Sequence, residues 1–430
     1  MKTYPEKVHL HDASSGASRR EVIGCPKHCM ISRGLSLPPS LLWSLALTSI
    51  FGLFVFHSVN PLRFPSRNAV PQNHALISPR RDESNCDLFK GQWMADHNGS
   101  IYTNSSCGTV PDSKNCFKNG RKDRDFLNWR WKPDGCELPR FDPHKYLKIV
   151  SGKKLAFVGD SVARNHLDSL LCLLSQAENP IDVYKDSEDH FRTWLFPAAN
   201  FTLMIFWSKF LMKHEERVIN GSNSGIFNLH LDKVDGAWAT KLQGIDYAII
   251  SAGHWFFRKN YLYHHDNLVG CVYCNDPNIT DFGVNYALRM AFRTSFEHVN
   301  QCKECKGMVT LLRTFSPAHF ENGTWNTGGG CNRTSPYSVG EVSRLETYEW
   351  ELRNLQVEEL ERAAKDGNGE REGKKFRVMD VTRTMLMRPD GHPGAYWGNK
   401  WMKGYSDCVH WCLPGPIDVW NDFLMASLQN

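Results

Sequence analysis

Leu155-Ala-Phe-Val158 and the turn after it, Gly159-Asp160-Ser161-Val-Ala-Arg164-Asn165, decide the fold of this chain. The apolar run predicts a buried strand, and the spacing of apolar residues from Val162 to Ser175 predicts a helix directly after it. A serine at such a turn presents its hydroxyl at the carboxyl end of a sheet, where main-chain N–H groups can hold an oxyanion. Ser161 is therefore a candidate nucleophile, although on this motif alone a helix N-cap serine is the better explanation.

Around this unit, apolar runs of strand length alternate with stretches of helical spacing. The predicted strands are 154–158, 201–206, 246–250, 308–312 and 376–379, and the predicted helices are 162–175, 284–299 and 342–364. Apolar runs of this length are typical of buried parallel strands. Their alternation with helices predicts an α/β fold, a three-layer α/β/α sandwich.

The C-terminal stretch Asp407-Cys-Val-His410-Trp-Cys412 offers partners for Ser161. A nucleophilic serine needs an imidazole to take its proton, and the imidazole needs a carboxylate to fix its tautomer and stabilise its charged form. Asp407 and His410 can supply both groups from one short loop. An Asp-x-x-His pattern alone is nearly as common as chance, so the hypothesis of a Ser161–His410–Asp407 triad depends on the combination.

The chain before residue 143 divides by composition. The charge-free stretch from Gly34 to Phe56 suits a bilayer-spanning helix of about 20 residues, with a buried core helix as the alternative. Lys and Arg outnumber Asp and Glu by six to three before it, while twelve of the fourteen cysteines and every glycosylation sequon follow it, which favours a type II orientation with a lumenal body. The predicted organisation is a cytosolic tail (1–33), a single transmembrane signal anchor (34–59), a Pro-containing stem (60–85), a disulfide-rich N-terminal block (86–142) and a catalytic domain (143–430). The sequons are at Asn98, Asn104, Asn200, Asn220, Asn278, Asn322 and Asn332.

Composition limits the class of protein. With 430 residues, 41% of them hydrophobic, the chain can bury a large core and is not disordered. The formal charge of +5 is small for this length, and long runs of Lys or Arg are missing, so nucleic acid is not expected as a partner.

Three blocks of residues together carry a resemblance to a known family. They are Cys86-Asp-Leu-Phe-Lys-Gly91-Gln-Trp93 with Tyr102, Cys107, Asn115-Cys116, Gly120-Arg121, Trp129-Arg130-Trp131-Lys-Pro133, Cys136, Leu138-Pro139 and Phe141-Asp142; Gly159-Asp160-Ser161 with Arg164-Asn165; and Asp407-x-x-His410 with Pro414-Gly-Pro-Ile-Asp418-Val-Trp420-Asn421. The chain resembles the plant trichome birefringence-like proteins, within the wider SGNH/GDSL group. That resemblance implies an O-acetyltransferase that acts on a cell-wall polysaccharide in the Golgi apparatus, its body lumenal.

In that family the serine forms an acetyl intermediate, which the resemblance assigns here to Ser161, with His410 as general base and then acid and Asp407 orienting it. The stretches 313–323 and 412–420 are most similar to members that act on xyloglucan side-chain galactose. Xylan, mannan or pectin remain alternative acceptors. A polysaccharide acetylesterase with the same triad and a non-enzymatic wall-polysaccharide binder are the alternatives from other classes.

Further site residues are predicted around the triad. Gly159 and Asp160 flank the serine, and Gly253, His254 and Trp255 follow strand 246–250, so they should open at the same sheet edge. Gly253 could donate its N–H to an oxyanion, although glycine after a strand is also ordinary turn chemistry. No plain Gly-x-Asn-Asp block is present, so Arg164 and Asn165 are the predicted substitutes for the second oxyanion donor. Arg313 and the stretch Arg388-Pro-Asp-Gly-His392 could bind sugar hydroxyls, with structural ion pairing as the alternative.

The family resemblance also implies four disulfides, Cys86–Cys136, Cys107–Cys172, Cys116–Cys412 and Cys331–Cys408. The four cysteines of Cys271-Val-Tyr-Cys274 and Cys302-Lys-Glu-Cys305 stay open between disulfides and a zinc site, and an oxidising lumen favours disulfides. The active site itself needs no metal, and no bound cofactor is expected. Acetyl-CoA or another acetyl carrier is expected as co-substrate, and the protein partners stay open.

Overall fold

The computed structural model describes residues 86–342, 348–366, 373, 375–398 and 404–429. The predicted tail (1–33), signal anchor (34–59) and stem (60–85) lie outside the described residues. Within the described part, no helix has both the length and the apolar character needed to cross a membrane.

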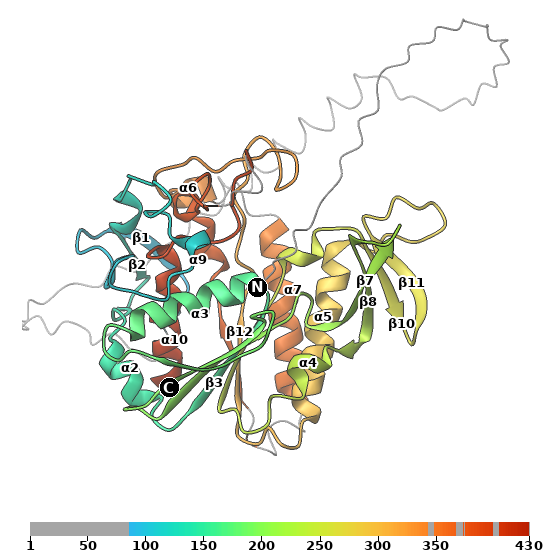
Figure 1. The fold of residues 1–430 in the computed structure, drawn as a ribbon, viewed down its shortest axis with the longest axis horizontal. Coiled ribbons are helices and arrows are strands. Elements are labelled where there is room, and N and C mark those ends of the chain that lie inside the picture. The colour runs from blue at the N-terminus through green and yellow to red at the C-terminus, as the bar shows by residue number, and fades with distance from the viewer. Residues whose placement is uncertain (1–85, 343–347, 367–372, 374, 399–403, 430) are drawn as a thin grey trace, which may run out of the picture. The chain divides into compact units, whose positions relative to one another are not determined.

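A seven-stranded sheet forms the centre of the catalytic domain (Figure 1). Its order is β13 (Lys375–Met379), β12 (Val309–Arg313), β9 (Tyr247–Ser251), β3 (Lys154–Gly159), β6 (Phe201–Trp207), β5 (Phe191–Phe196) and β4 (Ile181–Lys185). The first five are parallel to their neighbours, and β5 and β4 are antiparallel at one edge. All five predicted strands are confirmed to within one residue at each end.

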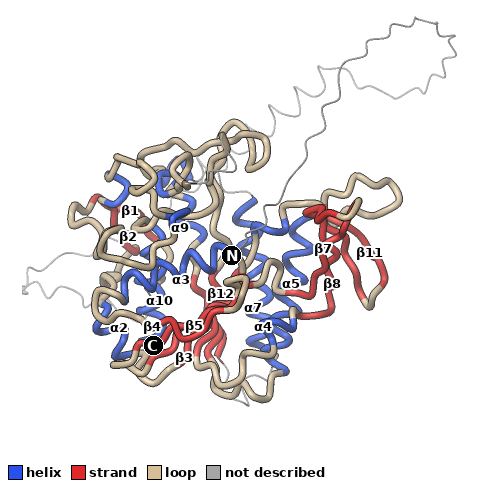
Figure 2. The backbone as a smooth tube through the Cα atoms, viewed as in Figure 1, coloured by secondary structure: helices blue, strands red, loops and turns tan. Residues whose placement is uncertain are grey.

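Helices cover both faces of this sheet, as Figures 1 and 2 show. On one face lie α2 (Pro143–Ile149), α3 (Ser161–Leu174) and α10 (Val419–Gln429), and on the other lie α4 (Gly236–Ala239), α5 (Gly283–Gln301) and α7 (Tyr348–Lys365). Alternate residues of β3 pack against the two helical layers. Leu155 and Phe157 pack with α3, while Ala156 and Val158 pack with α5. The α/β/α layering follows from this alternation.

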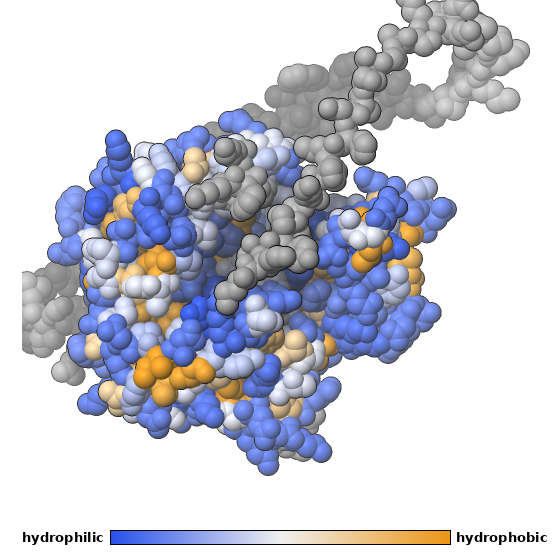
Figure 3. Space-filling model, in the orientation of Figure 1, coloured by the Kyte–Doolittle hydropathy of each residue, from blue (hydrophilic) through white to orange (hydrophobic). Residues whose placement is uncertain are grey.

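Several elements have no counterpart in the predictions. A second sheet contains β11 (Asn267–Val272), β10 (Asn260–His264), β8 (Ser222–Val234) and β7 (Met212–Ile219) in that order. Shorter helices are α6 (Val339–Val342) and α9 (Thr382–Leu386), so the predicted helix 342–364 corresponds to the end of α6 and to α7, with 343–347 outside the described residues. On the face shown in Figure 3, hydrophobic side chains form small separate patches among hydrophilic ones.

The N-terminal block packs on the α3/α10 layer and is tied to it covalently. It contains one antiparallel pair, β1 (Gly91–Ala95) and β2 (Trp129–Pro133), and otherwise loops and short turns. The disulfides Cys86–Cys136, Cys107–Cys172, Cys116–Cys412 and Cys331–Cys408 are the four pairs that the family resemblance implies. Cys271–Cys274 and Cys302–Cys305 form disulfides within their own motifs, which is the arrangement that an oxidising lumen favours.

Candidate active site

Ser161 stands at the carboxyl end of the central strand, as the first residue of α3. From β3 the chain passes through α3 and the β4–β5 pair to β6 on one side of β3, and β9 then lies on the other side. In open α/β sheets, ligands bind at such a change of direction, outside the carboxyl ends of the strands. The topology therefore puts Ser161 at the place where this fold class builds its sites.

Glycine and aspartate at the turn have separate geometric reasons. Gly159 has a φ of +152°, and a Cβ there would lie 1.8 Å from the carbonyl oxygen of Ser251, so a larger residue cannot fit. The Asp160 carboxylate accepts the N–H of Val162 at 2.9 Å and the N–H of Gly253 at 3.1 Å. Asp160 thus caps α3 and fixes the end of β9 to it. Because its N–H is bound to Asp160, Gly253 is not an oxyanion donor in this arrangement, contrary to the prediction.

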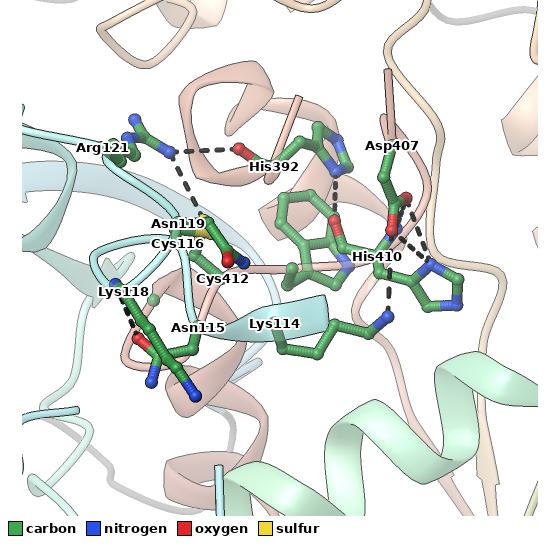
Figure 4. Close-up of a disulfide and its surroundings, with 12 residues drawn as sticks. Lys114, Asn115, Cys116, Lys118, Asn119, Arg121, His392, Asp407, His410 and Cys412 are labelled. Carbon is green, nitrogen blue, oxygen red and sulfur yellow. Dashed lines mark hydrogen bonds and ion pairs between the residues drawn. A yellow bond between two sulfur atoms is a disulfide. The ribbon is translucent and has the colours of Figure 1, made fainter. Parts of the chain in front are cut away.

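His410 and Asp407 form a tight pair (Figure 4). The His410 Nδ1 lies 2.8 Å from Asp407 Oδ2 and 3.1 Å from Oδ1, and Oδ1 also accepts the main-chain N–H groups of Val409 at 3.1 Å and His410 at 3.0 Å. A carboxylate only accepts, so Nδ1 carries the proton and Nε2 keeps its lone pair. The Nε2 atom is buried and has no hydrogen-bond partner, which leaves it free to take a proton.

The charge on Asp407 is held by its neighbours. Burial alone would raise the pKa of its carboxyl, but His410 and Lys114 outweigh the burial and hold the pKa well below its ordinary value. Asp407 therefore stays ionised over the whole physiological range. An ionised carboxylate at Nδ1 stabilises the imidazolium that forms when Nε2 takes a proton.

Three contacts position the loop that carries His410. Asn165, one helical turn after Ser161, accepts the Trp411 N–H at 2.7 Å and donates to the Trp411 carbonyl at 3.2 Å. His392 Nδ1 lies 2.7 Å from the carbonyl oxygen of His410, and the Trp411 indole donates to Ser316 Oγ at 3.0 Å. The loop is thereby fixed to the start of α3. The Asn165 amide oxygen and one of its two N–H groups are bound in this contact, which gives Asn165 a positioning role, while its role as an oxyanion donor stays a prediction.

Lys114 was not predicted as a site residue. It belongs to the N-terminal block, its carbonyl accepts the N–H of Leu413 at 2.9 Å, and its Nζ lies 3.8 Å from Asp407 Oδ2 (Figure 4). Its side chain is only 12% exposed. The signal that could have found it is its place two residues before Cys116, whose implied partner Cys412 lies in the His410 loop.

The serine opens into a cleft of about 590 Å³ between the N-terminal block and the edge strands. Its walls include Lys114, Arg164, Asp168 and Trp207. A volume of this size lies within the range of about 300 to 1,000 Å³ that is common for ligand sites.

The remaining predicted residues lie near the site in different ways. His254 Nε2 is 2.9 Å from the carbonyl oxygen of Ser316, and burial lowers the pKa of His254 to about 4, so its ring is neutral at physiological pH. The Trp255 indole packs edge-on against Trp207 with ring centroids 6.1 Å apart. Arg164 pairs with Asp189 at 3.5 Å on the cleft wall.

Two arginines predicted to contact sugars are buried instead. Arg313 is 2% exposed and stacks over Trp420, and burial lowers its pKa to about 10. Arg388 forms a buried ion pair with Asp390, with nitrogen–oxygen distances of 2.8 and 2.9 Å. Neither guanidinium reaches solvent, so the prediction of sugar binding is wrong for both, and Arg388 follows the alternative of structural ion pairing.

The chain matches two known family models and is similar to named plant proteins. Residues 138–427 match the PC-Esterase model, described as a GDSL/SGNH-like acyl-esterase family found in Pmr5 and Cas1p, and residues 84–137 match the PMR5 N-terminal domain. Xyloglucan O-acetyltransferase 4 of Populus trichocarpa is 63% identical over 385 residues, covering 90% of this chain and 91% of the relative. Xyloglucan O-acetyltransferase 2 of Arabidopsis thaliana is 52% identical, covering 91% and 92%. Protein trichome birefringence-like 19 of Arabidopsis thaliana is 45% identical, covering 80% and 81%.

Proposed function

The chain belongs to the PC-Esterase family of GDSL/SGNH-like acyl-esterases, and we propose that it is an O-acetyltransferase that acetylates xyloglucan. One observation of the structure supports acyl transfer by this site. Both oxygens of Asp407 hold His410 at Nδ1, and the buried Nε2 of the same ring has no partner, at the sheet edge where Ser161 begins α3. Relatives at 63%, 55% and 52% identity are named as xyloglucan O-acetyltransferases, which supports xyloglucan as the acceptor.

In the first half-reaction, Ser161 is the nucleophile. Its Oγ attacks the carbonyl carbon of the donor's acetyl group while His410 Nε2 takes the hydroxyl proton. The bond from the acetyl carbon to the donor's leaving group then breaks, and the leaving group takes that proton from His410. The product is acetyl-Ser161, with His410 neutral again. The donor, acetyl-CoA or another acetyl carrier, is a co-substrate.

In the second half-reaction, a sugar hydroxyl replaces the serine. His410 takes the proton of the acceptor hydroxyl, whose oxygen attacks the acetyl carbon, and the Ser161 Oγ leaves and regains the proton from His410. An acetylesterase would use water in place of the sugar hydroxyl. Binding of an acceptor in the cleft beside Ser161 displaces water from the acyl group and so favours transfer.

We also propose that the chain is a type II glycoprotein of the Golgi membrane, anchored through residues 34–59 with its body in the lumen. The sequons support this, because Asn98, Asn200, Asn220, Asn278, Asn322 and Asn332 are exposed and Asn104 is half-buried. Six disulfides also fit an oxidising compartment. Glycosidase sensitivity of the expressed chain, lost in variants with Asn changed to Gln at the sequons, tests the lumenal placement.

The function is tested by mass spectrometry of the purified full-length chain with acetyl-CoA or 4-nitrophenyl acetate and deacetylated oligosaccharides of xyloglucan, xylan or mannan. We expect an added acetyl mass on xyloglucan oligosaccharides with wild-type protein and with Ser151→Ala, a matched serine-to-alanine change in the exposed turn before β3. Ser161→Ala should transfer none. Release of acetate to water with no acetylated sugar would identify an esterase, and equal glycan binding by both variants without chemistry would identify a binder.

A further inference from the structure

The cleft at Ser161 contains a carboxylate that the triad does not use. Asp168 lies on α3 seven residues after Ser161 and lines the same cleft. The residue is 5% exposed, and its carboxylate makes no hydrogen bond or ion pair within the described part of the chain. Seven residues of α-helix span about 10 Å, so Asp168 is too far from Ser161 to take part in acyl transfer.

An unpaired buried carboxylate is costly and needs a compensating ligand or a proton. Burial raises the pKa of Asp168 to about 7, although Arg164, Lys114 and Arg192 act in the opposite direction. The carboxyl thus has open acceptor positions that face the cleft. Hydroxyl groups of a bound molecule could satisfy them.

The charges around Asp168 favour a neutral ligand. Arg164 pairs with Asp189 at 3.5 Å, and Arg192 pairs with Asp182 at 2.9 Å. The Lys114 ammonium lies 3.8 Å from Asp407. Each cation of this wall therefore already has a carboxylate, and Asp168 would repel an anion whenever it is ionised. A phosphate-bearing acetyl donor fits this end of the cleft poorly, whereas a polyhydroxylated neutral molecule fits it well.

Aromatic rings complete the surface. His190 and Trp207, both in the cleft wall, stack with ring centroids 4.4 Å apart and an interplanar angle of 7°. The His190 side chain is 38% exposed, so part of this aromatic pair is accessible from the solvent. A flat aromatic surface beside hydrogen-bonding carboxylates is suited to a sugar ring, which has an apolar face and a polar edge.

We propose that Asp168 is the hydrogen-bond acceptor of a second sugar subsite, which binds a neutral sugar of the acceptor other than the one acetylated at Ser161. This inference rests on the proposed function. In it the Asp168 carboxyl accepts hydroxyl groups of that sugar, and the stacked pair His190–Trp207 lies against the same chain of sugars. The subsite selects oligosaccharides over single sugars, and it plays no part in acylation of Ser161.

The test separates the two half-reactions in the full-length chain. With 4-nitrophenyl acetate alone, Asp168→Asn should form acetyl-Ser161 within about two-fold of the wild-type rate, because no acceptor is present. With xyloglucan oligosaccharides, its KM for the acceptor should rise about 10-fold to 100-fold, the usual effect of losing a hydrogen bond to a charged group. With free galactose, which cannot reach both subsites, the KM of the two proteins should be the same.

Asp266→Asn is the matched control, because its side chain is 68% exposed in the β10–β11 turn, and it should equal wild type throughout. Asp168→Ala is a second variant in case the amide itself binds sugar, and should show the same pattern. An unchanged acceptor KM in both variants overturns the subsite. The subsite is also overturned if the variants form acetyl-Ser161 more slowly by the same factor by which their acceptor KM rises, because Asp168 would then have a structural role. If the wild-type chain transfers to no oligosaccharide, the proposed function fails first and the subsite with it.

Discussion

Replacing Asn165 by alanine should reduce stability and activity together. The amide is buried, and its two hydrogen bonds to Trp411 join residues 246 positions apart in the chain. Asn165→Ala leaves the N–H and the carbonyl of Trp411 buried without partners. Each lost partner costs about 1–3 kcal/mol, and some relaxation is expected, so the free energy of unfolding should fall by roughly 2–4 kcal/mol.

Activity should fall because the same contact positions His410, the neighbour of Trp411. A displacement of about 1 Å in a catalytic group can cost about 100-fold in rate. We expect kcat for acetyl transfer to fall by about that factor, with little change in the KM for the acceptor. Urea unfolding followed by tryptophan fluorescence, with the disulfides intact, measures the first effect, and initial rates of acetyl transfer measure the second.

Asn326→Ala is the control, since Asn326 is exposed and accepts only a local hydrogen bond from Thr324, and it should change neither quantity. An oxyanion donor would give a different result. Loss of such a donor lowers kcat about 100-fold to 1,000-fold without a change in stability. An Asn165→Ala variant with that loss and the wild-type unfolding midpoint would therefore refute the positioning role and support the predicted role as an oxyanion donor.

Two further predictions concern Asp407 and the link to the N-terminal block. The pKa of Asp407 is lower in the folded chain than in the unfolded chain, so its stabilisation is complete above the unfolded value of about 4 and is lost as pH falls toward the folded value. The urea midpoint of wild type should thus fall more steeply below about pH 4 than the midpoint of Asp407→Asn. Equal slopes for the two proteins would contradict the ion pair. The kcat of Asp407→Asn should also be about 10⁴-fold lower than that of wild type. The double variant Cys116→Ser with Cys412→Ser should lose about 2–5 kcal/mol of stability in urea titrations, and no loss would show that the disulfide does not constrain the block.

The central fold could be predicted because its signals are local. Strand 154–158 is a short apolar run, and the turn after it has a glycine, an N-cap and a helix start in sequence. The second sheet lacks such a signal. Strand β7 reads Met-Lys-His-Glu-Glu-Arg-Val-Ile, and most of its residues are exposed, so its sequence resembles a solvated loop. Its pairing with β8 supplies the structure, and that pairing depends on the rest of the fold.

The site, like the central fold, could be predicted only where its signals are local in the sequence. Asp407 and His410 meet within one loop, and their pairing could be predicted because the same sequence also has Ser161 at a strand-to-helix turn. Asn165 was placed correctly on the first turn of α3, but sequence could not show that its amide faces Trp411 rather than a substrate. For Arg313, a charge at a strand end suggested a cleft residue, whereas the structure buries it over Trp420.

The N-terminal block is part of the active site rather than a separate glycan-binding module. Family models divide the chain between residues 137 and 138, yet the contacts cross that boundary. Arg121 of the block donates to the carbonyl oxygens of Asp390 at 2.7 Å and His392 at 3.1 Å, and His392 in turn contacts the carbonyl of His410. Lys114 adds a cation beside Asp407 and a wall to the cleft. A binder would need none of these contacts, so their presence at the Asp407–His410 pair is a reason for the block and the catalytic domain to occur in one chain.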